Sequence, residues 1–207
     1  MSTRMSMQDL MASKSNTTMR SRYKGLFAVA TIVSAAALHH VRAEAQGGGA
    51  PSDGQIVGIV LAADSIDIDY AKLAMLKTHN KQVTDFAQQM IADHSSVSKE
   101  VTALAGKLNL SPEDNETSNS LKTQAQRMTQ KLETLSGKEF ERAYIDNEVA
   151  YHQAVINATK TVLVPSAQNA ELKSALEGAE PLFDGHLQHA ERVQAAIEGT
   201  KPSASGY

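Results

Sequence analysis

The sequence predicts an all-α protein built as a helical bundle. Between residues 83 and 108 the apolar side chains follow one another at steps of four and three, which is the spacing of one face of an α-helix. This apolar seam consists of Val83, Ala87, Met90, Val97, Val101, Leu104 and Leu108. Similar seams recur along the chain, and no window shows the sustained alternation of a β-strand. We therefore expect several helices that bury one face each in a shared core.

The first two helices are the most regular. One is expected over residues 53–78, where Asp67 occupies a slot in an otherwise apolar stripe. The second contains the seam described above, with Asn80 as its N-cap, and is expected to end near Asn109. His94 is the polar member of that second seam. Both helices therefore place a polar side chain toward the core.

A shorter third helix is expected after a break in the pattern. Ser111 and Pro112 predict a new helix start, with serine as the N-cap and proline as the first helical residue. The polar segment 113–120 is interpreted as a loose connection, and apolar spacing returns over 121–135. This helix therefore contributes less apolar surface than the first two.

Two further helices complete the predicted domain. The segment 136–139, Ser-Gly-Lys-Glu, has the form of a capping box and predicts a helix over 137–163 that Pro165 terminates. The last helix is expected over 167–197, with a kink or a short interruption at residues 178–181, Gly-Ala-Glu-Pro.

The ends of the chain are expected to lie outside this domain. Basic residues precede the apolar run 25–38, and Ala43-Glu44-Ala45 supplies small residues at a cleavage site, as in a secretory signal peptide. The apolar run is short and alanine-rich for a membrane span, and an uncleaved anchor is the alternative interpretation. The predicted organisation is a signal peptide over 1–45, a linker over 46–52, the helical domain over 53–198 and a disordered tail over 199–207.

Composition restricts the partners of the mature chain. Cleavage after Ala45 removes six of the 20 basic and two of the 23 acidic residues, which leaves a formal charge of 14 − 21 = −7. An acidic domain of this kind is a poor nucleic-acid binder, because phosphate recognition needs a basic face. There is no cysteine, so we expect no lipid-modified N-terminal cysteine, no disulfide and no thiolate metal site.

Potential metal ligands interrupt the apolar seams of four predicted helices. They are Asp67, His94, the pair Glu148 and His152, and the pair His186 and His189. Residues three or four positions apart on a helix point in similar directions, so each pair can face one spot. Imidazole and carboxylate groups bind zinc, copper, iron or manganese, and helical bundles build metal sites from facing helices. We select Asp67, His94, Glu148, His152 and His186 as the candidate metal ligands.

A polar core without a metal is the alternative interpretation. A single seam histidine is more often hydrogen-bonded to a carboxylate or carbonyl than coordinated to an ion. Asp93 is expected to face outward or to cap locally, and His189 to lie at the solvent edge. Met90, four residues before His94, permits a copper-binding pair but is more often a packing residue. Several polar groups in one core layer favour a connected cluster, because isolated buried polar groups are costly.

The chain resembles the DUF4142 family over roughly residues 53–197. The resemblance lies in Phe86-Ala87 with Met90-Ile91-Ala92-Asp93-His94, in Leu135-Ser136-Gly137 with Phe140, Tyr144-Ile145 and His152, in Asp67-Ile68-Asp69 with Lys72-Leu73-Ala74, and in Pro181, Leu182 and His186. It implies a ferritin-like four-helix bundle with an additional short helix, exported in bacteria and labelled periplasmic or outer-membrane. The family has no assigned activity. This chain lacks the Glu-x-x-His of di-iron ferritin-like proteins and has Asp67 where the family usually has glutamate, which argues against ferroxidase or oxygenase chemistry.

Three functions follow as hypotheses. The leading one is an exported bundle that binds a transition metal in metal handling or stress protection. The second is a non-enzymatic cell-envelope module with a protein partner and a hydrogen-bonded polar core. The third is a pH sensor, because imidazoles titrate near neutral pH. No serine-centred triad, glycine-rich phosphate loop or H-E-x-x-H motif is present, so the sequence does not favour nucleophilic or nucleotide chemistry.

Overall fold

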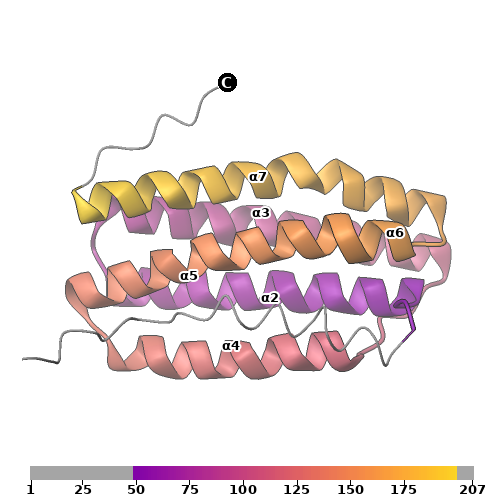
Figure 1. The fold of residues 1–207 in the computed structure, drawn as a ribbon, viewed down its shortest axis with the longest axis horizontal. Coiled ribbons are helices and arrows are strands. Elements are labelled where there is room, and N and C mark those ends of the chain that lie inside the picture. The colour runs from indigo at the N-terminus through magenta and orange to yellow at the C-terminus, as the bar shows by residue number, and fades with distance from the viewer. Residues whose placement is uncertain (1–48, 200–207) are drawn as a thin grey trace, which may run out of the picture. The chain divides into compact units, whose positions relative to one another are not determined.

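The computed structural model describes residues 49–199, and within them the prediction of an all-α fold is confirmed. The elements are α2 (Asp53–Lys77), α3 (Lys81–Leu108), α4 (Glu116–Thr134), α5 (Gly137–Ala158), the π-helical turn η1 (Thr159–Leu163), α6 (Val164–Ser166) and α7 (Ala170–Glu198), as shown in Figure 1. The predicted signal peptide, the start of the linker and residues 200–207 lie outside the described part. Between residues 49 and 199, no helix combines the length and apolar character needed to cross a membrane.

In the described part of the chain, four long helices form the bundle, and a further helix, α4, connects its two halves. The helices α2, α3, α7 and α5 pack in a closed square, in that order, and sequence neighbours α2–α3 and α5–α7 are antiparallel hairpins (Figure 1). The helix α4 lies outside this square, against α2, and returns the chain to the end where α3 began. One such crossover between the second and third bundle helices is the connection used in ferritin-like folds. The helix α4 is therefore the additional helix that was predicted.

Polar caps define the starts of three bundle helices. Ser52 forms a capping box with Gln55 at the start of α2. The side chain of Asn80 accepts from the Gln82 N–H at the start of α3, as predicted. Asn169 accepts from two backbone N–H groups of α7. Each cap satisfies donors that the first helical turn leaves unpaired.

The predicted helix start at Ser111 and Pro112 is wrong. Residues 110–115 are not helical, and α4 begins after the N-cap Asn115. The connection stays non-helical because it crosses α2 at very close range. The Glu113 N–H donates to the Gly54 carbonyl at 3.0 Å. A Cβ on Gly58 would lie only 2.1 Å from the Glu113 carbonyl oxygen. Glycine at these positions is what allows the crossover to begin.

Two predictions about the second half of the chain are also wrong. Ser136 is the N-cap of α5, but its side chain makes no capping hydrogen bond, and Gly137 has a positive φ of 53°. Pro165 does not end the helix. The Val164 N–H donates to the Thr159 carbonyl, five residues back, and this wider π turn carries the helical path through Pro165 into α6.

The final helix is slightly shorter than predicted, and it is continuous. It starts at Ala170 rather than at residue 167 and runs without interruption through Pro181 to Glu198. Gly199 follows it with a left-handed backbone, φ 68°, as is common after a helix end.

The core consists of two apolar clusters separated along the bundle by a polar layer. One cluster contains Ile56, Val57, Ile59, Ala105, Leu163, Leu172 and Leu176. The other contains Ile66, Tyr70, Phe86, Met90, Leu132, Phe140, Tyr144, Ile145 and Ala190 among its members. Along each bundle helix, buried polar residues separate the members of one cluster from those of the other. These residues are Asp64, His94, Glu148, His152 and His186. The polar layer is therefore a feature of the middle of the bundle.

Candidate metal centre

The structure brings all five predicted ligands into this polar layer. Asp67 comes from α2, His94 from α3, Glu148 and His152 from α5, and His186 from α7. Each of the five is buried, with at most 3 % of its surface exposed. One nitrogen each from His94, His152 and His186 lie within 4.8 Å of one another, and so do donor atoms of Asp67, Glu148 and His152. All four bundle helices therefore contribute to one cluster of donors.

His94 is held by a carboxylate that the sequence prediction did not include. Its Nδ1 lies 2.8 Å from Oδ1 of Asp64, a buried residue of α2. The other Asp64 oxygen accepts from the Ser98 hydroxyl at 3.0 Å. An ionised carboxylate only accepts, so Nδ1 of His94 carries the hydrogen and Nε2 points to the centre.

The other two imidazoles are held in the same way. His152 Nδ1 donates to the backbone carbonyl of Glu148 at 3.0 Å, one turn earlier on α5. His186 Nε2 donates to Oδ2 of Asp93 at 2.9 Å. In each ring an outer N–H has an acceptor, which orients the ring so that its other nitrogen faces the centre. Metal-ligating histidines are typically held by such outer acceptors.

The inward-facing atoms, by contrast, have no hydrogen-bond partner. They are His94 Nε2, His152 Nε2, His186 Nδ1 and both carboxylate oxygens of Asp67 and of Glu148. Asp67 Oδ2 lies 3.1 Å from His94 Nε2 and 3.4 Å from His152 Nε2, but neither contact is aligned as a hydrogen bond. The edge of a tetrahedron of ligands around zinc is about 3.3 Å, given zinc–ligand distances of about 2.0–2.1 Å. A cation would satisfy these buried atoms together.

The electrostatics of the layer follow from burial and from the carboxylates. Burial opposes the charge on His94, but the hydrogen bond to Asp64 and the nearby carboxylates of Asp64 and Asp67 outweigh it and raise its pKa to about 10. Burial lowers the pKa of His152 to about 4. Burial and the charge of Asp67 raise the pKa of Glu148 well above its usual range. Without a metal, protons on His94 and Glu148 therefore offset the negative charge that a cation would otherwise neutralise.

The donor set fits a transition metal of borderline hardness. It contains three imidazoles and two carboxylates, with no sulfur ligand, which suits zinc, iron, manganese or copper(II) rather than copper(I). Met90 is buried in the apolar cluster, as expected of a packing residue.

The comparison with known families identifies the family of this domain. The sequence model of the domain of unknown function DUF4142 matches residues 39–193, most of the chain. The chain belongs to the DUF4142 family. No curated protein and no solved structure matches it. The family assignment is thus secure, and it brings no activity with it.

Two aspartates of this DUF4142 protein complete the centre and were not selected as site residues. Asp93 was expected to face outward or to cap locally, but it bridges from α3 to His186 on α7. Asp64 was missed altogether. Its signal was its position three residues before Asp67, which places both side chains on one side of α2. His189 remains outside the centre, where its Nδ1 lies 2.8 Å from Gln89 Oε1.

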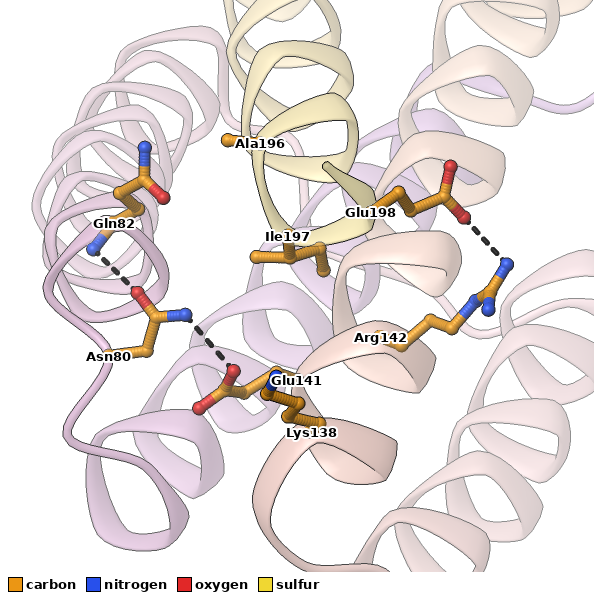
Figure 2. Close-up of a pocket in the computed structure, with 8 residues that line it drawn as sticks. All are labelled: Asn80, Gln82, Lys138, Glu141, Arg142, Ala196, Ile197 and Glu198. Atoms are coloured by element: carbon orange, nitrogen blue, oxygen red, sulfur yellow. Dashed lines mark hydrogen bonds and ion pairs between the residues drawn. The ribbon is translucent and has the colours of Figure 1, made fainter. Parts of the chain in front are cut away.

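The surface pocket of the DUF4142 domain lies elsewhere. A pocket lies at the end of the bundle, where the starts of α3 and α5 meet the end of α7 (Figure 2). Its volume is about 620 Å³. Three of its charged side chains, Arg142, Glu198 and Glu141, are paired within the protein. Arg142 contacts Glu198 at 2.6 Å, and Glu141 accepts from the Asn80 amide at 3.0 Å. No unpaired buried group faces this pocket among the side chains that Figure 2 labels, so it does not indicate a ligand.

Proposed function

We propose that this protein binds a transition metal ion through Asp67, His94, Glu148, His152 and His186. The bound ion serves metal handling or stress protection rather than rapid turnover of a substrate. Three imidazole nitrogens and Asp67 would supply the primary ligands, with Glu148 as the adjacent carboxylate. The bound metal would supply a positive charge that neutralises the buried carboxylates.

One observation carries this proposal: the outer N–H of every imidazole is bonded, whereas the inner nitrogen of every imidazole is not. A polar core that had evolved only to satisfy itself should pair both sides, because a buried unpaired polar group costs about 1–3 kcal/mol. Among the described residues, nine buried side-chain atoms lack a hydrogen-bond partner, and seven of them belong to the five candidate ligands on facing helices. The other two are the Tyr144 hydroxyl and the Asn147 amide nitrogen, both on α5. That pattern is the one a metal would complete.

The test is metal analysis of mature protein purified without a histidine tag. We expect bound metal at a defined stoichiometry, and a melting temperature that falls with a chelator and returns when zinc, copper, iron or manganese is added. Absence of bound metal, together with a melting temperature unchanged by all four ions, would refute the proposal.

A non-enzymatic polar core is the second candidate, and the His94 contacts favour it. A protonated His94 between Asp64 and Asp67 forms a charge-paired group without a metal. The inner nitrogens of His152 and His186 and both Glu148 oxygens still lack partners in that state. On this alternative the domain acts as a cell-envelope module, and a partner captured from envelope extracts would survive chelation.

We also propose that the protein is exported to the periplasm or secreted. The support is the sequence of the leader, with its basic residues, apolar run and small residues at 43–45. Sequencing the N-terminus of protein recovered from the cell envelope tests this. A chain beginning at Gln46 is expected, and a full-length chain retained in the cytoplasm would contradict it.

A further inference from the structure

The three groups that accept hydrogen bonds from the imidazole N–H groups differ in their exposure to solvent. They are Asp64 for His94, the Glu148 carbonyl for His152 and Asp93 for His186. Asp64 and the backbone carbonyl of Glu148 belong to fully enclosed residues. The side chain of Asp93, in contrast, is 31 % exposed, while the imidazole it holds, His186, is buried. His186 therefore forms the wall between solvent and the inner donors, with Nε2 facing the exposed carboxylate and Nδ1 facing inward.

Polar side chains line the junction of α3 and α7 on this side of the bundle. One turn along from the Asp93–His186 contact, Gln89 on α3 meets His189 on α7 at 2.8 Å. Farther along, a groove of about 300 Å³ opens between the same two helices. It is lined by Gln82, Asp85, His189, Arg192 and Val193. The junction of α3 and α7 is also less extensive than those of the hairpins α2–α3 and α5–α7. Polar side chains therefore extend along this junction from the groove to the Asp93–His186 contact.

The segment of α7 that carries His186 has an unusual composition for a helix. It contains Gly178, Pro181 and Gly185 within eight positions. Close packing does not require glycine at either position, because an added Cβ would have no neighbouring atom within 4 Å. Neither has a positive φ. Glycine and proline are the two weakest helix formers, so residues 178–186 are held helical by tertiary contacts rather than by their own preference.

Those contacts join the segment directly to the centre. The Phe183 ring stacks on the His94 ring, with centroids 5.9 Å apart and planes at 11°. Lys160, in the π turn, lies 3.8 Å from Glu180 and 3.7 Å from Asp184. A local opening of residues 178–186 would withdraw Phe183 and His186 together and uncover the inner donors of the other helices.

We propose that the metal ion reaches and leaves the centre between α3 and α7, through local opening of residues 178–186. The partly exposed carboxylate of Asp93 would contact the incoming ion before the buried ligands do. Once residues 178–186 return to the closed helix, His186 would again separate the ion from solvent. This inference rests on the proposed metal binding but goes beyond it, because it assigns Gly178, Pro181 and Gly185 a role in exchange rather than in affinity.

The experiment stabilises the helical conformation of residues 178–186 without replacing any of the proposed metal ligands. Zinc uptake by the untagged, metal-free protein and zinc release to a fluorescent chelator are measured by stopped flow for the wild type and for Gly178→Ala/Gly185→Ala. Alanine stabilises the helix, so opening becomes rarer. We expect uptake and release to slow together by roughly tenfold, with the Kd for zinc unchanged. Gly106→Ala in α3 is the matched control, since it also adds a methyl group to a helix in open space. It should leave both rates unchanged.

Each outcome discriminates. Unchanged exchange rates in the double variant, or equal slowing in the control, would overturn the access route while leaving metal binding intact. A change in Kd without a change in uptake rate would overturn it too, because that result assigns the glycines to affinity. Amide hydrogen exchange of the metal-free protein tests the opening itself, independently of any metal. Residues 178–186 should exchange faster than the rest of α7, and protection equal to that of α3 would refute the opening.

Discussion

Replacing His152 by leucine separates the two roles that the polar layer can have. The side chain is 1 % exposed, its Nε2 has no partner, and its Nδ1 donates to the Glu148 carbonyl at 3.0 Å. Leucine has a comparable size and removes both ring nitrogens. A metal ligand and a self-satisfied core residue respond to this change in opposite ways.

The expected magnitudes follow from these contacts. In the metal-free protein, the substitution relieves a buried unpaired nitrogen, worth about 1–3 kcal/mol, and loses one hydrogen bond, worth about 1 kcal/mol. The variant should therefore be as stable as the wild type or up to about 2 kcal/mol more stable. With metal at a hundred times its Kd, the wild type gains about 2.7 kcal/mol. For a domain of this size that corresponds to a rise in Tm of roughly 5–10 °C. The variant should lose most of this rise.

The assay is thermal unfolding followed by circular dichroism at pH 7, with chelator and with added zinc. His189→Leu is the control, because His189 lies outside the centre and its loss should preserve the metal-dependent rise. A metal-free His152→Leu protein that is more than 1 kcal/mol less stable, by the conversion above, or that retains the full response to zinc, would refute the reasoning.

Three other predictions concern the fold and the outer acceptors. Gly58→Ala should cost at least about 2–3 kcal/mol in urea unfolding, because its Cβ would overlap a carbonyl oxygen of the α3–α4 connection, whereas Gly106→Ala should not destabilise the protein. In the metal-free protein, the folded pKa of His152 is about 4, below the unfolded value of 6.5, so its contribution is present above pH 6.5 and is lost as pH falls through 4. The folded pKa of His94 is about 10, so its contribution is present below pH 6.5 and is lost as pH rises through 10. Burial and the charge of Asp67 also raise the pKa of Glu148, whose contribution is likewise lost as pH rises. The free energy of unfolding should therefore fall between pH 6.5 and pH 10, and a flat profile over that range would contradict the His94 shift. Asp64→Asn should weaken zinc binding by about 10–100-fold in a competition titration, because the amide cannot hold His94 with its Nε2 lone pair directed inward as firmly as the carboxylate does.

Much of the fold could be predicted from the sequence because a helix that buries one face has apolar residues at regular intervals of three and four. The steps of four and three located α3 well, and Asn80 identified its start. Ser111 and Pro112 misled because they carry a local helix-start signal that a tertiary contact overrides. The backbone of residues 111–113 packs closely against Gly54 and Gly58. Nothing in the local sequence of this segment indicates that contact.

The candidate site was predictable to the extent that its residues lie in apolar seams. His94 and His152 each interrupt an apolar face, and the structure buries both in the polar layer. That they bind a metal remains a prediction. Asp93 was assigned outward because neighbouring residues on a helix point about 100° apart, and only the position of α7 reveals its partner. Its role depends on how two helices are placed, which a single-helix pattern does not contain.

The origin of the ligands in all four bundle helices also has a consequence for when the centre comes into existence. His186 follows Asp67 by 186 − 67 = 119 residues, and it reaches the layer only when α7 docks. A chain that has emerged only as far as α5 therefore has an incomplete donor set. If the protein binds a metal as proposed, capture of the ion would be tied to the completion of folding. For an exported chain, completion comes after translocation, so the compartment of arrival, rather than that of synthesis, would decide which ion the protein holds.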